Sequence, residues 1–457
     1  MNITIKKLSA LTMATMMAAS VFAGCGQKAS TTPGTGTQGS TATAAPKEVT
    51  LNFTTWVNNK DTSGAYVDEN VTKAFTKKYP NIKVNFQLLT ENDSNSYHQK
   101  TDLMIAGGDN IDIVQYSTRT AFYDRVGRNM LAPLDEYIAA EGKKYSDMFN
   151  IDTSMNGKIY AMPWDVKPSI VLLNKKYLDE AGLSIPKLDW TWDDFRDYAK
   201  KLTKGEGKDK RYGTYFWTTQ GYKWYGLRNA YDFDPLLKKD GTSNVTDPNL
   251  KEWLKFYSDI ENVDKSSFPY GEAKAGKIAY RDLFFQGKIA ILPIGLWMIP
   301  EIATSNAKYP HDWVTAFAPV PKYKNFATGV TNGDACFAAV PAASKNKAEA
   351  YKLAKFNAEE GVNIRATGLP AKKDYNLDDL LKIMMAGQEK MYDVPSMKAT
   401  IAGMKVQAAT NIFSYSQKVL DSVDAQVEKY LVGGATLDQA IADADKAAKD
   451  IIAAEKK

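Results

Sequence analysis

The sequence predicts an α/β protein in which helices cover parallel strands, and three observations favour this fold class. From residue 48 onward, short extended segments alternate with amphipathic segments of helical period. A second series of the same kind begins after Pro163. The length of 457 residues is typical of two domains, and 44% apolar residues with 11% aromatic ones suffice for their cores. A largely disordered chain is therefore excluded.

The first series contains three extended segments separated by two helical ones. The predicted strands are 49–56, 82–88 and 111–116, and the predicted helices are 71–78 and a segment that runs through Met104. Pro80 ends the first helix because the residue before a proline avoids helical geometry. Gly107 and Gly108 close the second helix. Strand–helix units that follow one another in this way favour a parallel sheet.

The second series contains two core strands and several helices. Residues 170–174 are a continuous apolar run, typical of a buried parallel strand, and 288–293 is another core strand. Thr191 is the predicted N-cap of a helix with acids in its first turn, and Ser344 opens another helix. Residues 436–439 form a capping box before an Ala-rich helix at the C-terminus. Four tryptophans are expected to pack in the core, namely Trp190, Trp192, Trp253 and Trp313.

The N-terminal residues have the features of a signal for export and lipid attachment. Residues 1–24 have the features of an export signal, because two lysines precede a short apolar stretch. That stretch is shorter than the roughly 20 apolar residues that span a bilayer. Ala23 and Gly24 lead into Cys25, which resembles a bacterial lipobox and implies cleavage before Cys25 and a lipid such as palmitate on it. Ordinary signal cleavage beside a chance cysteine is the alternative.

A tether follows the cysteine. Residues 26–47 contain no Leu, Ile, Val, Met or aromatic residue. Such a segment buries too little apolar surface to offset its chain entropy, so 25–47 is predicted to be a lipidated cysteine on a flexible tether. Signal, lipid and tether together predict the extracytoplasmic face of a bacterial cell membrane, with the lipid anchor as the contact to the membrane.

Charge and residue usage exclude several function classes. The net charge is +5, but four lysines precede residue 48, and without them it is +1. Nucleic acid is therefore not expected as a partner, because phosphate binding needs uncompensated basic clusters. The two cysteines, Cys25 and Cys336, permit no disulfide framework or cysteine-based zinc site. The two histidines, His98 and His311, lie in no catalytic motif, so no metal or cofactor is predicted.

An ordered set of segments carries a family resemblance. The segments are 75–84, 105–109 before 112–114, 131–136, 157–163 with 173–176, 285–290 with 295–297, 338–341 and 368–371. In this order they resemble extracellular solute-binding protein family 1, the maltose-binding-protein-like substrate-binding lipoproteins of carbohydrate ABC importers. The resemblance covers residues 49–371, with a looser helical tail. It implies a monomer that binds a carbohydrate, delivers it to the transmembrane subunits of an ABC importer and is not an enzyme.

The resemblance also implies a periplasmic-binding-protein-like fold, with two α/β lobes, a hinge and a ligand cleft between them. Carried over to this chain, the parts are 48–160 plus 333–385 for lobe one, 165–328 plus 386–457 for lobe two, and 161–165 and 329–333 for the hinge. Lobes of this kind close around ligand, and ligand favours closure by its higher affinity for the closed state.

The candidate binding residues follow from what a sugar needs. A pyranose has an apolar face and a rim of hydroxyls, so its site needs aromatic platforms with Asp, Asn, Glu or Arg at the edges. Several candidates follow predicted strands, where α/β sheets bind ligands, and others lie at the crossings or in an aromatic loop. The resemblance adds an acid after the first crossing and an aromatic at 297. The predicted residues are Trp56, Glu91, Tyr116, Arg119, Trp164, Asp165, Tyr222, Trp224, Trp297, Asn332 and Asp334.

The sequence leaves two other functions open. A secreted glycoside hydrolase also needs aromatic platforms and carboxylates, and Glu91 with Asp165 is the pair that would serve it. A receptor for a peptide, a polyamine or an iron complex is the other alternative. Arg365 either reaches the cleft or pairs on the surface. The aromatic, Asn and Asp character of the candidates fits a sugar best.

Overall fold

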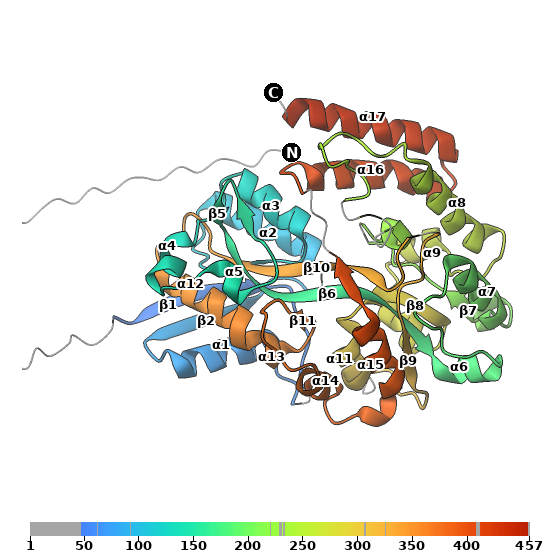
Figure 1. Ribbon diagram of the computed structural model, residues 1–457, viewed down its shortest axis with the longest axis horizontal. Coiled ribbons are helices and arrows are strands. Elements are labelled where there is room, and N and C mark those ends of the chain that lie inside the picture. The colour runs from blue at the N-terminus through green and yellow to red at the C-terminus, as the bar shows by residue number, and fades with distance from the viewer. Residues whose placement is uncertain are drawn as a thin grey trace, which may run out of the picture. The chain divides into compact units, whose positions relative to one another are not determined.

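A computed structural model describes residues 47–61, 63–91, 93–219, 221–227, 231, 234–305, 308–324, 326–407 and 412–455 (Figure 1). The predicted signal, Cys25 and nearly all of the tether lie outside these residues. Residues 47–457 form one compact unit.

Strands and helices alternate along the unit, as an α/β class requires. The strands are β1 (Val49–Thr55), β2 (Ile82–Leu88), β3 (Val114–Tyr116), β4 (Ser154–Met155), β5 (Lys158–Ile159), β6 (Ala161–Asn174), β7 (Tyr212–Thr214), β8 (Ile289–Gly295), β9 (Thr315–Ala318), β10 (Val330–Ala339), β11 (Leu369–Pro370) and β12 (Lys405–Gln407). The α-helices are α1 (Val67–Lys78), α2 (Ser94–Gly107), α3 (Arg119–Gly127), α4 (Asp135–Ala140), α5 (Tyr145–Met148), α6 (Lys175–Glu180), α7 (Trp192–Leu202), α8 (Pro248–Asn262), α9 (Tyr270–Ala275), α10 (Tyr280–Phe285), α11 (Met298–Ser305), α12 (Lys347–Phe356), α13 (Val362–Arg365), α14 (Leu377–Met385), α15 (Val394–Gly403), α16 (Ser416–Leu431) and α17 (Leu437–Glu455). Short 3-10 turns lie at Gly207–Asp209, Tyr222–Leu227 and Glu389–Met391, and a π-helical turn at Asn357–Gly361.

The first three strands form the parallel arrangement that the sequence predicts. β1 and β2 are parallel along their whole length, from Val49 opposite Ile82 to Thr55 opposite Leu88. Ile113, one residue before β3, bridges to β1 in parallel. β3 then pairs antiparallel with β10, which returns from far along the sequence.

The prediction that residues 170–174 form a parallel strand is wrong. Residues 170–174 are the end of the 14-residue strand β6, which is antiparallel to β8, β9 and β10. Burial on both faces produced the continuous apolar run, and antiparallel neighbours bury a strand as fully as parallel ones do. β7 and β8 are the parallel pair of this sheet.

The helix ends follow their local signals closely. Gly108 closes α2 with a left-handed φ of 85°. Thr191 and Asp194 form a capping box at the start of α7. Ser344 is not an N-cap, because its hydroxyl donates to buried Asp112 and α12 begins three residues later.

Two hydrophobic clusters form the cores. The first core cluster contains buried side chains from 51–166, 335–358 and 371, and the second core cluster contains those from 170–323, 366–369 and 380–452. β6 passes from the first to the second between Val166 and Ile170, and β10 lies beside it across the middle of the view (Figure 1). β11 pairs with β6 at Asp165 and Val166, so a third segment joins the two clusters at the same place.

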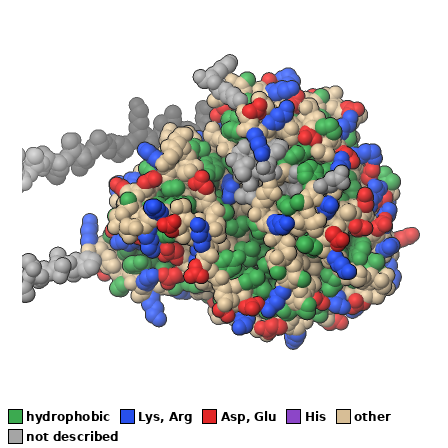
Figure 2. Space-filling model, in the orientation of Figure 1, with side chains coloured by type: hydrophobic (Ala, Val, Ile, Leu, Met, Phe, Trp, Pro, Cys, Tyr) green, Lys and Arg blue, Asp and Glu red, His purple; other side chains and the backbone are tan. Residues whose placement is uncertain are grey.

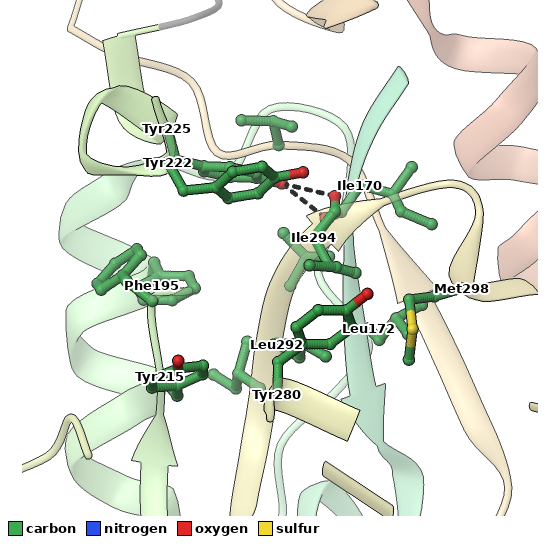
Figure 3. Close-up of a cluster of buried hydrophobic side chains, with 14 of the residues drawn as sticks. Ile170, Leu172, Phe195, Tyr215, Tyr222, Tyr225, Tyr280, Leu292, Ile294 and Met298 are labelled. Carbon is green, nitrogen blue, oxygen red and sulfur yellow. Dashed lines mark hydrogen bonds between the residues drawn. The ribbon is translucent and has the colours of Figure 1, made fainter. Parts of the chain in front are cut away.

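The second core cluster is rich in aromatic rings. Figure 3 shows Ile170 and Leu172 of β6 beside Leu292 and Ile294 of β8, with tyrosine rings over the sheet. The hydroxyl oxygen of Tyr225 lies 2.6 Å from the carbonyl oxygen of Ile170 and 3.2 Å from that of Ile294. The expectation that four tryptophans pack in the core is confirmed, because all are buried in this cluster: Trp190, Trp192, Trp253 and Trp313.

The surface carries both signs of charge. Basic and acidic side chains are interspersed over the face shown in Figure 2, in keeping with a nearly neutral folded part. No helix within the described ranges has the length and apolar character needed to cross a membrane.

Candidate functional site

A cavity of about 180 Å³ lies between the two core clusters, and we call it the first cavity. Its wall comes from many elements that are distant in sequence. The lining residues are Trp56, Val57, Asn59, Ser94, Asn95, Ser117, Thr118, Lys167, Trp217, Thr219, Tyr222, Tyr280, Arg281, Trp297, Glu301, Asp334, Cys336 and Thr367. Many of them follow β1, β3, β7 and β8 directly, because the loops beyond the carboxyl ends of the strands converge there.

Elements of the second core cluster supply an aromatic wall. The ring of Trp217 lies 4.7 Å from those of Tyr222 and Tyr280, and 6.2 Å from that of Trp297. The indole Nε1 of Trp297 donates to the hydroxyl of Tyr280 at 3.1 Å, which fixes the orientation of the ring. Burial raises the pKa of Tyr280, so its hydroxyl stays neutral. The first core cluster supplies one aromatic residue, Trp56.

Besides Trp56, Val57 and Cys336, elements of the first core cluster supply several amides and hydroxyls. Asn59 follows β1, and Ser94 and Asn95 open α2. Ser117 and Thr118 follow β3. This side of the cavity can therefore donate to and accept from a polar ligand, while the other side offers ring faces.

An ion pair adjoins the aromatic wall, with the guanidinium of Arg281 4.4 Å from the centroid of the Tyr280 ring. The guanidinium of Arg281 binds the carboxylate of Glu301 in two places, with its Nη2 2.6 Å from Oε1. The amide Nδ2 of Asn59 donates to the same Oε1 at 3.3 Å. Because Asn59 follows β1 and Glu301 lies on α11, this hydrogen bond joins the two sides of the cavity.

A second charged group lies where the strands cross. The Lys167 Nζ is 3.6 Å from Asp165 Oδ2, which also accepts from the hydroxyl of Thr367 at 3.1 Å. Asp165 is fully buried, and burial raises its pKa, although Lys167 opposes this shift. Burial also raises the pKa of the neighbouring thiol of Cys336, so this cysteine is held in its unreactive form.

A smaller cavity of about 120 Å³, the second cavity, adjoins the first. It is lined by Thr118, Arg119, Thr120, Gly221, Trp224, Asp234, Pro235, Leu236, Asn332, Gly333, Asp334, Ile412 and Leu420. Thr118 and Asp334 line both cavities. The Asp334 Oδ1 accepts from the backbone N–H groups of Arg119 and Ala335, each at 3.0 Å, which holds the carboxylate in place.

The predicted site residues fall into three groups. The first cavity is lined by Trp56, Tyr222, Trp297 and Asp334, and the second by Arg119, Trp224, Asn332 and Asp334. The remaining predicted residues are in the wall of neither cavity: Glu91, Tyr116, Trp164 and Asp165. As ligand contacts, all of these residues remain predictions.

The four residues outside the walls have other positions. Glu91 is exposed. Tyr116, Trp164 and Asp165 are fully buried. Two cations contact the Trp164 ring, with the Lys167 Nζ 4.8 Å and the guanidinium of Arg365 4.3 Å from its centroid. Trp164 and Asp165 therefore contribute to the crossing behind the cavity.

Sequence reasoning missed several lining residues. Trp217 comes directly after an extended segment, so the strand-end rule that selected Trp56 also applies to it. Glu301 is a single acid in an otherwise apolar helix, a pattern that signals a buried partner. Tyr280 and Arg281 carried no signal, because they lie in an ordinary amphipathic segment.

The described residues contain no group of three or more His, Cys, Asp or Glu side chains placed to hold a metal ion.

Comparison with known proteins identifies the family. Residues 58–364 match the sequence profile of the bacterial extracellular solute-binding proteins. The chain belongs to this family. Its members are binding proteins rather than enzymes.

This solute-binding protein has relatives of named function. A putative binding protein of Brucella abortus is 27% identical over 332 residues, which cover 69% of this chain and 76% of the relative. The diacetylchitobiose binding protein DasA of Streptomyces coelicolor is 27% identical over 197 residues, covering 42% of this chain and 43% of that protein.

Solved structures show the same fold. The ABC substrate-binding protein of Listeria monocytogenes in complex with cycloalternan superposes with a TM-score of 0.72 at 22% identity, covering 89% of this chain and all of that one. Maltose-bound MalE3 of T. maritima superposes with a TM-score of 0.70 at 18% identity, covering 88% of this chain and all of that one. The two-lobe fold expected from the resemblance is confirmed.

Proposed function

We propose that this solute-binding protein is the receptor of an ABC-type importer that captures an uncharged saccharide between its two lobes and delivers it to the permease. One observation carries the proposal. The first cavity has ring faces on one side and amide and hydroxyl groups on the other.

That division suits the two kinds of surface on a sugar. The C–H face of a pyranose packs against an indole or phenol ring, which stays dry. Each hydroxyl taken from water needs a partner, and Asn59, Asn95, Ser94 and Ser117 are placed to supply one. An apolar solute leaves these polar groups unsatisfied, and a strongly polar one does not use the rings.

The charges of the cavity are matched within the protein. Lys167 faces Asp165, and Arg281 faces Glu301. Asp334 accepts two backbone N–H groups. An acidic or cationic ligand has to break one of these pairs, and a buried charge without its partner is costly. A neutral saccharide needs no such exchange, so polyamines and sugar acids are disfavoured.

Relatives support the same class of ligand. Proteins similar to this chain include the diacetylchitobiose binding protein of Streptomyces coelicolor, a maltotriose-binding protein of Pyrococcus abyssi and an arabinooligosaccharide-binding protein of Halalkalibacterium halodurans. Similar folds have been solved with cycloalternan and with maltose bound.

A glycoside hydrolase is not favoured. Hydrolysis needs two carboxyl groups that flank one glycosidic bond. Glu91 is exposed and Asp165 is buried behind the wall, so this pair does not meet at the cavity. The carboxylates that do line the first cavity, Glu301 and Asp334, are already engaged.

The proposed lobes follow the two core clusters, with the hinge at the crossing of β6, β10 and β11. One change from the predicted bounds is needed. Leu380, Leu381, Met384 and Met385 of α14 are buried in the second core cluster, so we place α14 in lobe two and end lobe one near residue 371. Lipid attachment at Cys25, a tether to residue 47 and a monomeric state complete the proposal.

A binding screen tests the function. Residues 47–457 are scanned by thermal unfolding against neutral mono- and oligosaccharides, with glucuronate, spermidine and amino acids as controls. Ligand at 100 times its Kd adds about 2.7 kcal/mol. An unfolding entropy of about 2.1 cal/mol/K per residue turns this into a rise in Tm of about 3 °C.

The outcomes separate the alternatives. A saturable rise with a neutral saccharide and no product formed supports the receptor. A rise only with glucuronate, spermidine or an amino acid overturns the saccharide assignment. The matched variants are Trp297→Ala, which removes a ring from the wall, and Trp313→Phe, which changes a ring in the core. Only the first is expected to abolish the rise.

A further inference from the structure

We infer that the ligand is an oligosaccharide of two or more residues that spans both cavities, with one sugar residue in the first cavity and the next in the second. This inference rests on the proposed function and names the length of the ligand. Three features of the structure carry it.

The first feature is the volume of the two cavities. A cavity needs only about 10–15 Å³ of such volume to hold one water. The first cavity, of about 180 Å³, and the second, of about 120 Å³, both exceed this several-fold. Each of the two cavities therefore admits a group larger than a single water, and neither is a minor pocket beside the other.

The second feature is that the two cavities share a wall. Thr118 and Asp334 belong to both linings. The carboxylate of Asp334 is fixed there by the N–H groups of Arg119 and Ala335, and Thr118 is the N-cap of α3. A rigid acceptor between two neighbouring cavities is placed to bind hydroxyls on both sides of a glycosidic bond.

The third feature is the chemistry of the second cavity. It repeats the pairing of ring and polar groups found in the first, with Trp224 beside Asn332 and Thr120. The Trp224 Nε1 and the N–H of Gly221 both donate to Asp424, each at 2.8 Å, so the ring is held rigidly. The hydroxyl of Thr120 donates to Gln417 of α16 at 2.8 Å, so a second lining residue is held by the same helix. A preorganised wall of this kind lowers the cost of binding a second sugar residue.

The test compares chain lengths within one sugar class by isothermal titration calorimetry. The probes are glucose, maltose and maltotriose, with N-acetylglucosamine and diacetylchitobiose, and xylose and xylobiose as parallel series. In the series that binds, the two-residue member is expected to bind at least tenfold more tightly than the monosaccharide. Two matched variants show which cavity supplies this gain in affinity. They are Asn332→Ala in the second cavity and Asn59→Ala in the first.

Asn332→Ala is expected to remove most of the gain in affinity, so that the Kd values of the monosaccharide and the two-residue member come close to one another. Asn59→Ala is expected to weaken both ligands alike. The inference is overturned if the monosaccharide and the two-residue saccharide bind with equal affinity, or if Asn332→Ala leaves the gain in affinity intact. Either result is still compatible with a saccharide receptor. If every series fails to bind while another solute does, the proposed function falls, and this inference falls with it.

Discussion

The buried ion pair between Arg365 and Asp68 offers a strong test of the packing in lobe one. Both side chains are fully buried, and the guanidinium contacts Asp68, Asn357 and the Trp164 ring. Arg365→Met keeps an unbranched apolar stem but removes the guanidinium, which leaves the Asp68 carboxylate without its counter-charge. Breaking a buried pair in this way costs about 3–5 kcal/mol. Arg365 thus neither reaches the cleft nor pairs on the surface, which were the two positions expected from sequence.

The assay is calorimetric unfolding of residues 47–457. An entropy of about 2.1 cal/mol/K per residue amounts to about 0.9 kcal/mol per K over this unit, so Tm is expected to fall by about 3–6 °C. The control is Lys78→Met, which breaks the exposed pair with Glu360, whose side chains are 49% and 47% exposed. Such a pair contributes about 0–1 kcal/mol, so Tm should move by about 1 °C or less. Equal small shifts for Arg365→Met and Lys78→Met would refute the reasoning.

Three further predictions follow from single sites. Burial, with the nearby Arg125 charge, lowers the pKa of His98 to about 3, so only the unfolded chain takes up this proton between pH 6.5 and 3. The free energy of unfolding should therefore fall by up to about 1.4 kcal/mol for each pH unit as the pH is lowered through that window. Urea unfolding of His98→Phe should show a smaller fall per pH unit than the parent protein. Equal pH dependence of the two proteins would contradict this. A Cβ on Gly295 would lie 1.7 Å from the Trp297 ring, so Gly295→Ala should weaken ligand binding at least tenfold in calorimetry, whereas Gly271→Ala, with its nearest neighbour at 4.0 Å, should not. The thiol of Cys336 is fully buried, so in residues 47–457 it should react with a disulfide reagent only after unfolding, and rapid labelling of the folded protein would contradict its burial.

The paired charges of the first cavity connect stability to selectivity. Glu301 serves both Arg281 and Asn59, and Asp165 serves both Lys167 and Thr367. Each carboxylate therefore joins groups from different parts of the chain. A ligand that leaves these contacts intact binds through hydroxyls rather than charges, which is the physical basis for the proposed preference for neutral saccharides.

Much of the local structure was determined by the sequence. The alternation of 82–88 predicted the bounds of β2 without error, and Gly107 with Gly108 marked the end of α2. Thr191 was predicted as the N-cap of α7, and the structure completes a capping box with Asp194, whose hydrogen bonds join residues only three apart. Features of this kind depend on neighbours in the chain, so a single sequence is enough to read them.

Tertiary structure decided the rest. The apolar run 170–174 indicated burial but not direction, because direction depends on β8, β9 and β10, which come more than a hundred residues later. Trp56 and Trp164 look alike in sequence, yet Trp56 lines the first cavity while Trp164 is fully buried against Lys167 and Arg365. Arg281 and Asn59 became site residues only because Glu301 brings them together. Periodicity fixes which face of an element is buried, whereas the composition of a cleft depends on contacts between elements far apart in the chain, and one sequence does not encode those contacts in any local pattern.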